Sequence, residues 1–410
     1  MNLPAQTSST PFSDLADVAA TYAEFAADPR HGRAIEGIPA ELAARLPGFV
    51  EFGIDGELLV EAIRAAGRER GPATPGWAEA ISAYGARAAA LGEAAQAGAR
   101  PREAERRFLE ASFWYFLARF PHILNPAGAR AYQAHREAYA KALALSEFPG
   151  ALVEIPFGDK KAPAWLRLPA HAATQPPVVI LWGGIDVWKS DQEIHSQSEA
   201  LLRRGVATLA LDMPGTGEAP APVSTTAESL HRAALGFLRG ESRVDGARIG
   251  AYGLSFGGYF AVKLALLEPA LAGVVEVGGP IHLAFQPANL ARLPLGTKIA
   301  MARVLGLDPL GDPARLGHAL AALSLSAQGL LPAKAQAPLL SINGDLDELV
   351  PIAELNYLRD QGVAQDRLQF ADDRHVASRN WRLHEAFAAD WLANRLGVAS
   401  APCSRRGTPQ

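Results

Sequence analysis

A serine flanked by glycines at 253–257 is the part of this sequence best suited to chemistry. The segment reads G-L-S-F-G; an apolar run ends at its first glycine, and a helical pattern follows it. G-x-S-x-G between a strand and a helix is typical of a nucleophile elbow, a tight turn that exposes a serine hydroxyl. The five-residue pattern alone arises by chance in roughly one such chain in five to ten, so its context carries the prediction. We predict Ser255 as the nucleophile, with the Phe256 N–H at the helix start binding a developing oxyanion.

A serine hydroxyl needs a base, and two histidines follow residue 338, namely His375 and His384. In folds with this elbow the chain order is serine, acid, histidine. His375 stands in A-D-D-R-H-V-A, after the short apolar run L-Q-F and before the last helical pattern. His384 lies inside that helical pattern. We therefore predict His375 as the base.

The acid that orients this base should end a strand that lies between the serine and the histidine. The run L-L-S-I-N-G-D-L-D-E-L-V-P at 339–351 has this form. Asp347 stands three residues after a glycine and four before a proline, a spacing usual for such acids, and we predict it. Asp345 is the rival, with helix capping as its structural alternative. Asp372 and Asp373 adjoin the base, where capping or solvation of the loop is the better interpretation.

A second oxyanion donor should come from the loop that follows the third strand. That loop reads W-G-G-I-D-V-W-K-S-D at 182–191, and its glycines would let the backbone approach a substrate closely. We predict the Ile185 N–H as this donor, with Gly184 as second choice; a plain strand-ending turn is the alternative. The glycine-rich segment 211–218 looks structural, and we assign it no catalytic part.

The elements that position these residues follow two kinds of hydrophobic pattern, one before and one after about residue 147. Residues 13–145 carry apolar positions at helical spacing, which predicts about five or six helices; Pro101 and Pro121 bound one of them. After 147, apolar runs alternate with helical stretches, which predicts a mostly parallel eight-stranded sheet covered on both faces. The predicted strands are 151–156, 163–168, 177–182, 206–212, 247–252, 272–277, 338–342 and 367–370. G-D-K-K at 158–161 predicts a hairpin turn between the first two, and 280–330 reads as a helical insertion.

We therefore expect a helical domain at 1–146, a catalytic domain at 147–397 and a loose tail at 398–410. The chain has 410 residues, 49% hydrophobic and 20% charged, and a net charge of −4. This balance offers no basic face for nucleic acid or an anionic membrane. The single cysteine, Cys403, excludes a disulfide within the chain. With no signal-peptide pattern and no long apolar stretch, we expect a cytoplasmic protein that needs neither metal nor cofactor.

Together these motifs resemble α/β-hydrolases with an N-terminal helical domain. This group includes the 2,6-dihydroxypseudooxynicotine hydrolases, the fermentation–respiration switch proteins and the fungal polyketide-shortening hydrolases. The resemblance covers roughly 100–396, and the loop at 182–191 is its most telling part; in the family this loop tends to read G-G-L-D-S-x-K-E-E. Lys189 keeps the basic position, but Ser190 and Asp191 stand where two glutamates are common. In the pseudooxynicotine hydrolase a glutamate of this region reaches the substrate.

The resemblance implies that the helical domain and the insertion close over the site, and that the protein is a homodimer. Asp186, Lys189 and Asp191 are then candidate substrate ligands, although a first-turn or N-cap carboxylate is the structural alternative for Asp191. Trp114 and Tyr115 could line a pocket for a ring-bearing substrate; core packing is the alternative for each.

The sequence thus predicts a serine hydrolase that acts on a small carbonyl compound through an acyl-serine intermediate. Within that class we favour cleavage of a carbon–carbon bond in an aromatic or polyketide-like ketone or β-dicarbonyl compound. A carboxylesterase or thioesterase is the alternative. A non-catalytic regulatory or binding protein on a hydrolase scaffold is the alternative from another class, and the intact Ser, His and Asp argue against it.

Overall fold

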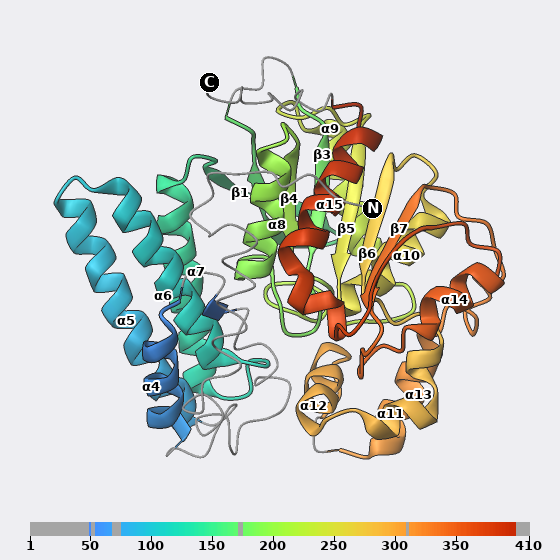
Figure 1. The fold of residues 1–410 in the computed structure, drawn as a ribbon, viewed down its shortest axis with the longest axis horizontal. Coiled ribbons are helices and arrows are strands. Elements are labelled where there is room, and N and C mark those ends of the chain that lie inside the picture. Colours follow the sequence, from blue (N-terminus) through green and yellow to red (C-terminus); the bar gives the residue numbers. More distant parts are fainter. Residues whose placement is uncertain (1–48, 51–53, 68–74, 171–174, 309–310, 399–410) are drawn as a thin grey trace, which may run out of the picture.

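The structure, a computed structural model, describes residues 49–50, 54–67, 75–170, 175–308 and 311–398. A layer of helices built from the N-terminal part of the chain stands beside a sheet that is itself covered by helices (Figure 1). The predicted tail, apart from residue 398, and much of the predicted first helices lie outside the described residues. No described helix is long and apolar enough to cross a membrane.

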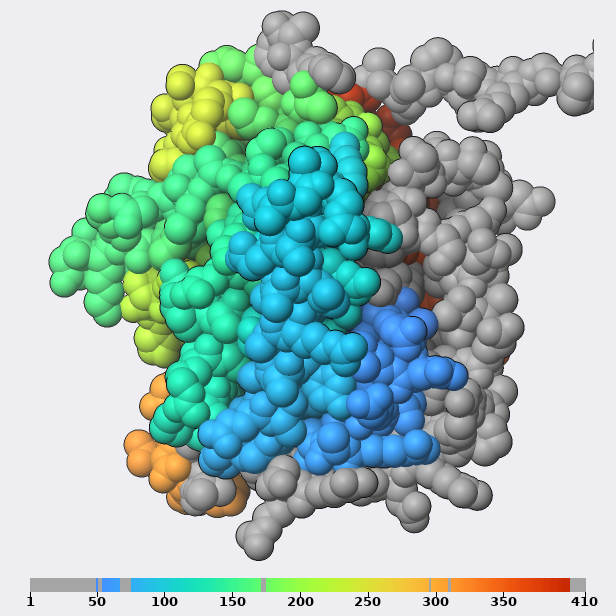
Figure 2. All heavy atoms as spheres, turned by 90° about the vertical axis from the view of Figure 1, so that its left-hand side faces the viewer, coloured from blue at the N-terminus to red at the C-terminus, as the bar shows by residue number. Residues whose placement is uncertain are grey.

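The described N-terminal layer is helical, as its apolar spacing predicts. Its helices are α4 (Gly56–Gly67), α5 (Pro75–Ala97), α6 (Pro101–Arg119) and α7 (Pro126–Leu145). Both α6 and α7 start with proline in the first turn, where the missing N–H removes no helical hydrogen bond. The Asn125 side chain caps α7 by accepting a hydrogen bond from the Gly128 N–H at 2.9 Å. Figure 2 looks onto the outer face of this layer, with α4 and α5 in front.

The sheet has eight strands in the order β1-β2-β4-β3-β5-β6-β7-β8, which confirms the predicted fold. The strands are β1 (Gly150–Phe157), β2 (Lys160–Arg167), β3 (Val178–Trp182), β4 (Ala207–Leu211), β5 (Ile249–Leu254), β6 (Gly273–Val277), β7 (Leu339–Gly344) and β8 (Asp366–Phe370). Strand β2 pairs antiparallel with β1 and β4, and all other pairs are parallel. The predicted turn joins β1 to β2, and Gly158 there has a φ of +60°.

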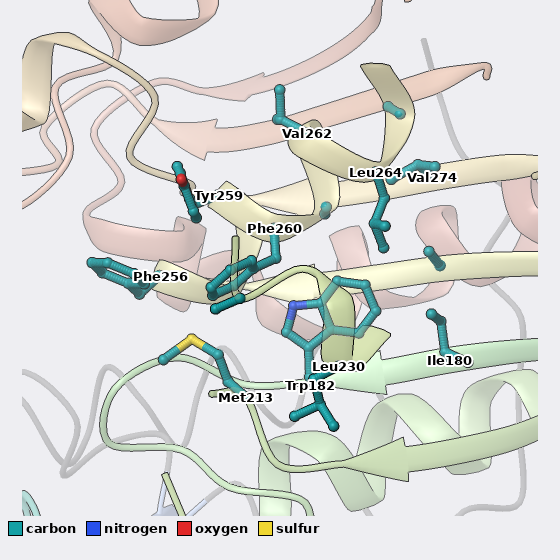
Figure 3. Packing of buried hydrophobic residues seen from close by; sticks show 14 of the residues in the cluster. Ile180, Trp182, Met213, Leu230, Phe256, Tyr259, Phe260, Val262, Leu264 and Val274 are labelled. Carbon is teal, nitrogen blue, oxygen red and sulfur yellow. The ribbon is translucent and has the colours of Figure 1, made fainter. Parts of the chain in front are cut away.

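Helices on both faces bury the strands, because successive side chains of a strand point to opposite sides. Along β3, Ile180 and Trp182 pack on the face of α9 (Ser229–Gly240) and α10 (Phe256–Leu267). Figure 3 shows this face, where the Trp182 ring lies beside Leu230 and Phe260. Val179 and Leu181 pack on the other face, which α8 (Gln192–Leu202) and α15 (Trp381–Arg395) cover. A strand buried on both faces must be apolar at every position, as β3 is.

The predicted insertion leaves the sheet after β6 and returns to β7. It contains η1 (Leu283–Phe285), α11 (Pro287–Arg292), α12 (Leu295–Val304) and α13 (Pro313–Ala322), and α14 (Ala353–Asp360) follows β7. Glu354 of α14 is buried, and its carboxylate accepts hydrogen bonds from the backbone N–H groups of Ile281, His282 and Ala284. At the far end of the insertion, the Leu325 N–H donates to the Ile281 carbonyl at 3.0 Å.

Candidate active site

Ser255 occupies a strained turn between β5 and α10. Its φ of 57° and ψ of −128° lie outside the regions that side chains normally adopt. A Cβ at Gly253 would lie 2.4 Å from the Gly257 carbonyl oxygen, and one at Gly257 would lie 2.3 Å from the Gly183 carbonyl oxygen. The two glycines of the motif are therefore required by the close approach of three backbone segments, and strain of this kind is common at functional sites.

The three side chains predicted as a triad form one chain of hydrogen bonds. Ser255 Oγ lies 2.7 Å from His375 Nε2, and His375 Nδ1 lies 2.7 Å from Asp347 Oδ2. The other carboxylate oxygen of Asp347 accepts hydrogen bonds from the N–H groups of Leu349 and Val350 at 2.8 and 2.9 Å. These donors hold the carboxylate toward the imidazole, and the imidazole can then take the serine proton at Nε2.

The rival aspartate and the rival histidine lie elsewhere. Asp345 accepts a hydrogen bond from the Gln369 amide at 2.6 Å and caps no helix with that contact. His384 is fully buried inside α15, where loss of water lowers its pKa to about 3 and keeps the ring neutral. The geometry thus supports Asp347 and His375 over both alternatives.

Two further side chains hold the loops of this triad; sequence reasoning overlooked Asn343, whereas Asp373 takes the capping role expected of it. Asn343, at the end of β7, donates to Asp347 Oδ2 at 2.8 Å and accepts the Val376 N–H at 3.1 Å. It therefore links the acid to the residue after the base. Asp373 is buried and accepts backbone N–H groups of Arg374 and Asn380 at 2.7 and 3.1 Å, which caps the turn carrying the base. The available signal was a polar residue at the carboxyl end of a largely apolar strand, directly before Gly344.

The loop after β3 lies directly against the nucleophile, as the oxyanion hypothesis requires. A Cβ at Gly184 would stand 2.8 Å from Ser255 Cβ, 3.0 Å from its Oγ and 3.2 Å from the Phe256 nitrogen. The backbone at 184–185 and the Phe256 N–H therefore flank the same hydroxyl. The Trp182 indole N–H ties this loop to the elbow by donating to the Gly257 carbonyl at 2.8 Å. This arrangement can supply two backbone donors to a tetrahedral oxyanion.

Lys189 requires a correction, because the structure gives its charge a different partner from the one expected. The ammonium is 1% exposed and forms ion pairs with Asp212 and Glu218, the latter at 2.8 Å. The Lys189 N–H also donates to Asp212 Oδ1 at 2.9 Å. A buried ammonium held by two carboxylates anchors the loop after β4 and is not presented to a substrate.

Asp191 requires a similar correction. It stands at the N-cap position of α8, yet its side chain caps no helical N–H. Its carboxylate is fully buried, forms an ion pair with Arg119 of α6 and accepts the Trp188 N–H at 2.6 Å. The carbonyl of half-buried Asp186 accepts a hydrogen bond from the same guanidinium at 3.3 Å. Sequence reasoning missed Arg119, because its partners lie about seventy positions away.

Trp114 and Tyr115 belong to the core of the helical layer, which corrects their proposed pocket role. The Trp114 ring is fully buried and lies 5.3 Å from the Tyr84 ring of α5, centroid to centroid. A Cβ at Gly85 of α5 would lie 2.8 Å from the Tyr115 ring. Both side chains thus face α5. Ser112 and Arg119, also of α6, meet the loop and the helix after β3.

The helical layer also reaches the other loops around the site. The His122 ring lies 3.4 Å from the Gly215 carbonyl of the loop after β4, and burial lowers its pKa to about 4. Arg303 of α12 donates to the Ile123 carbonyl at 3.3 Å. The segment after α6 therefore touches both the sheet loops and the insertion.

In the described part of the chain, no group of three or more His, Cys, Asp or Glu side chains could hold a metal ion.

Comparison with known proteins gives consistent matches. The family description "Esterase FrsA-like" matches residues 77–397. Esterase FrsA of Vibrio cholerae serotype O1 is 29% identical over 301 residues, which are 72% of this chain and 71% of that protein. Esterase FrsA of Salmonella schwarzengrund is 31% identical over 298 residues, 71% and 70% of the two chains. The structure of 2,6-dihydroxy-pseudo-oxynicotine hydrolase matches with a TM-score of 0.69 at 25% identity, over 80% of this chain and 91% of its own.

Proposed function

The chain belongs to the FrsA-like esterase family of α/β-hydrolases, and from that premise we propose that it hydrolyses carboxylic esters through an acyl-serine intermediate on Ser255. The observation that carries the proposal is the continuous hydrogen-bond chain from Ser255 through His375 to Asp347, with both links at 2.7 Å. A serine, a base and an orienting acid at these distances are the requirements for an activated nucleophile.

Each step has a group in place. His375 Nε2 takes the proton as Ser255 Oγ attacks the ester carbonyl, and the Phe256 and Ile185 N–H groups bind the oxyanion that forms. His375 then gives the proton to the leaving alkoxide. A water molecule repeats the sequence on the acyl-serine, with the same base and the same donors, and releases the acid.

Carbon–carbon bond cleavage is the second candidate, because a hydrolase of 2,6-dihydroxy-pseudo-oxynicotine shares the fold over most of both chains. A ketone must expel carbon, which requires a stabilised carbanion and a ready proton. The sequence suggested Lys189 and Asp191 as the additional polar groups for this task. Both charges are held in buried ion pairs, so we place ester hydrolysis ahead of ketone cleavage and reverse the order that the resemblance favoured.

The test combines labelling with a substrate comparison. A fluorophosphonate probe should label the wild-type protein and leave Ser255→Ala unlabelled, since the probe reacts with an activated serine. The value of kcat/KM should be higher for short p-nitrophenyl esters than for aryl β-diketones or dihydroxyphenyl ketones. Absence of labelling would favour a non-catalytic protein on this scaffold. Labelling together with faster ketone cleavage would reverse the order of the two candidates.

A further inference from the structure

Arg119 connects the helical layer to the loop that flanks the nucleophile. It is the last residue of α6 and is 1% exposed. One guanidinium nitrogen donates to the Asp186 carbonyl at 3.3 Å, and another forms the ion pair with Asp191. The guanidinium carbon also lies 3.5 Å from the centroid of the Trp188 ring, a cation–π contact. The Arg119 side chain thus contacts the loop after β3 at Asp186, Trp188 and Asp191.

The loop at 185–191 is also held together by hydrogen bonds between its own residues. The Trp188 N–H donates to Asp191 Oδ2 at 2.6 Å, and the Trp188 indole N–H lies 3.4 Å from the Ile185 carbonyl. Ile185 follows Gly184, where an added Cβ would lie within 3.2 Å of both Ser255 and the Phe256 nitrogen. A displacement of Asp191 or Trp188 is therefore transmitted to the backbone at 184–185 within a few bonds.

We propose that Arg119 is a positioning residue through which the helical domain holds the oxyanion loop in its catalytic shape. This inference rests on the proposed acyl-serine function. On this view the orientation of one oxyanion donor depends on the docking of α6. Arg119 touches no reacting atom, and its effect passes through Asp186, Trp188 and Asp191.

The imperfect bonding of the ion pair supports a positioning role over a purely stabilising one. Arg119 Nε is buried without a hydrogen-bond partner, and Asp191 Oδ1 has only a long contact of 3.4 Å with the buried His135 Nε2. A buried ion pair with unsatisfied atoms is weak evidence for stability, since well-packed apolar residues often do as well. The planar guanidinium can instead hold a carbonyl, a carboxylate and an aromatic ring in one fixed arrangement, which an ammonium on a flexible stem cannot reproduce.

The experiment compares Arg119→Met with Arg130→Met. Arg130 is an exposed arginine of the same helical layer, paired with Glu79 at 3.2 Å on the surface. Three quantities are measured for each variant: kcat and KM for p-nitrophenyl butyrate, the inhibition constant of an aryl boronic acid, and hydrogen exchange of the backbone at 183–191. The boronate forms a tetrahedral adduct on the serine and therefore reports the oxyanion donors, while KM reports ground-state binding.

For Arg119→Met we expect kcat to fall about 10- to 100-fold with KM changed less than about 3-fold, because misplacement by about 1 Å can lower a rate 100-fold. The boronate inhibition constant should rise in proportion to the fall in kcat/KM, and exchange at 183–191 should accelerate. Arg130→Met should match the wild type in all three. Arg119→Lys should recover part of the loss at most.

Removal of one partner can also unfold the protein, because it leaves Asp191 charged and buried. The double variant Arg119→Met/Asp191→Asn removes both charges, while the amide oxygen can still accept the Trp188 N–H. We expect it to fold and to keep the low kcat. Unchanged exchange at 183–191 in folded Arg119 variants would overturn the inference even if the wild type proved inactive on esters. Faster exchange with kcat and boronate inhibition equal to those of Arg130→Met would overturn it as well.

Discussion

Gly184→Ala tests the geometry of the oxyanion loop most directly. The backbone of Gly184 lies outside the left-handed region, so alanine is acceptable there as far as its φ is concerned. The added methyl carbon would stand 3.2 Å from the Phe256 nitrogen and 3.0 Å from Ser255 Oγ. An oxyanion must lie about 2.7–3.1 Å from its donors, so the methyl group would fill the space that the oxyanion needs.

The magnitude follows from the loss of one donor. Removal of an oxyanion-hole donor lowers kcat about 10²- to 10³-fold, which corresponds to about 2.7–4 kcal/mol of transition-state stabilisation. The methyl carbon would also lie 2.8 Å from Ser255 Cβ, closer than atoms pack. Because the elbow backbone cannot move freely, we expect overpacking to lower the free energy of unfolding by about 1–3 kcal/mol. Turnover of p-nitrophenyl butyrate and urea unfolding measure the two effects.

Gly236→Ala is the matched control. It lies on the exposed side of α9, where an added Cβ meets no atom within 4 Å. Alanine is the better helix former, so this variant should keep full activity and gain about 0.5–1 kcal/mol of stability. If Gly184→Ala retained kcat/KM within about threefold of this control, the backbone at 184–185 could not be an oxyanion donor, and the assignment would have to be abandoned.

Three further predictions concern the acid, the asparagine that holds it and two buried histidines. Asp347→Asn should lower kcat by about 10⁴-fold because the base loses its orienting charge, whereas Asp345→Asn should stay within about threefold; the reverse order in a kinetic comparison would show that the acid is misassigned. Asn343→Ala should lower the free energy of unfolding by about 1–3 kcal/mol, since buried groups lose their partners, and should lower kcat more than it changes KM; wild-type values in urea unfolding and kinetics would contradict this. Burial lowers the pKa of His231 and His384 to about 3, whereas the same side chains have a pKa near 6.5 in the unfolded state, so the unfolded state binds more protons between these values. The free energy of unfolding is therefore highest above about pH 6.5. It should fall by up to about 1.4 kcal/mol per pH unit for each histidine as the pH drops toward 3. In His384→Leu the slope measured by urea unfolding between pH 6 and 5 should be smaller, and an unchanged slope would count against the burial argument.

The sheet and the triad positions could be predicted because their signals are local. Alternation of short apolar runs with helical stretches predicts the strands, and the observed bounds differ from the expected ones by at most three residues. The glycines at 253 and 257 are needed by contacts within a few residues of the elbow and by the neighbouring loop. Spacing to Gly344 and Pro351 singled out the acid in the same way.

The roles of charged and aromatic residues outside the triad depended on packing between distant segments. Lys189 looks like a ligand in the sequence, but its carboxylates lie 23 and 29 positions later, in a segment that we considered merely structural. Trp114 lies in an aromatic run that covers more than one helix face. The face of α6 that meets the catalytic domain depends on how this helix packs, and the pattern of apolar residues does not predict that packing. Arg119 escaped notice for the same reason.

The two ends of the insertion lie side by side, and this has a consequence for how the selectivity of this protein could change. The chain leaves at Ile281 and comes back at Leu325, and these two residues share a backbone hydrogen bond at 3.0 Å. Glu354, which binds the backbone where the chain leaves β6, lies outside the segment. Residues 282–324 therefore leave and rejoin the rest of the chain at one place, and they also contact it through Glu354, through the Arg303 side chain and through the Val304 carbonyl, which accepts the Val223 N–H at 2.8 Å. Recombination or design can exchange this segment for one of different length while the sheet and the elbow remain as they are, provided that Glu354, the Ile281–Leu325 bond and the contacts of α12 are kept.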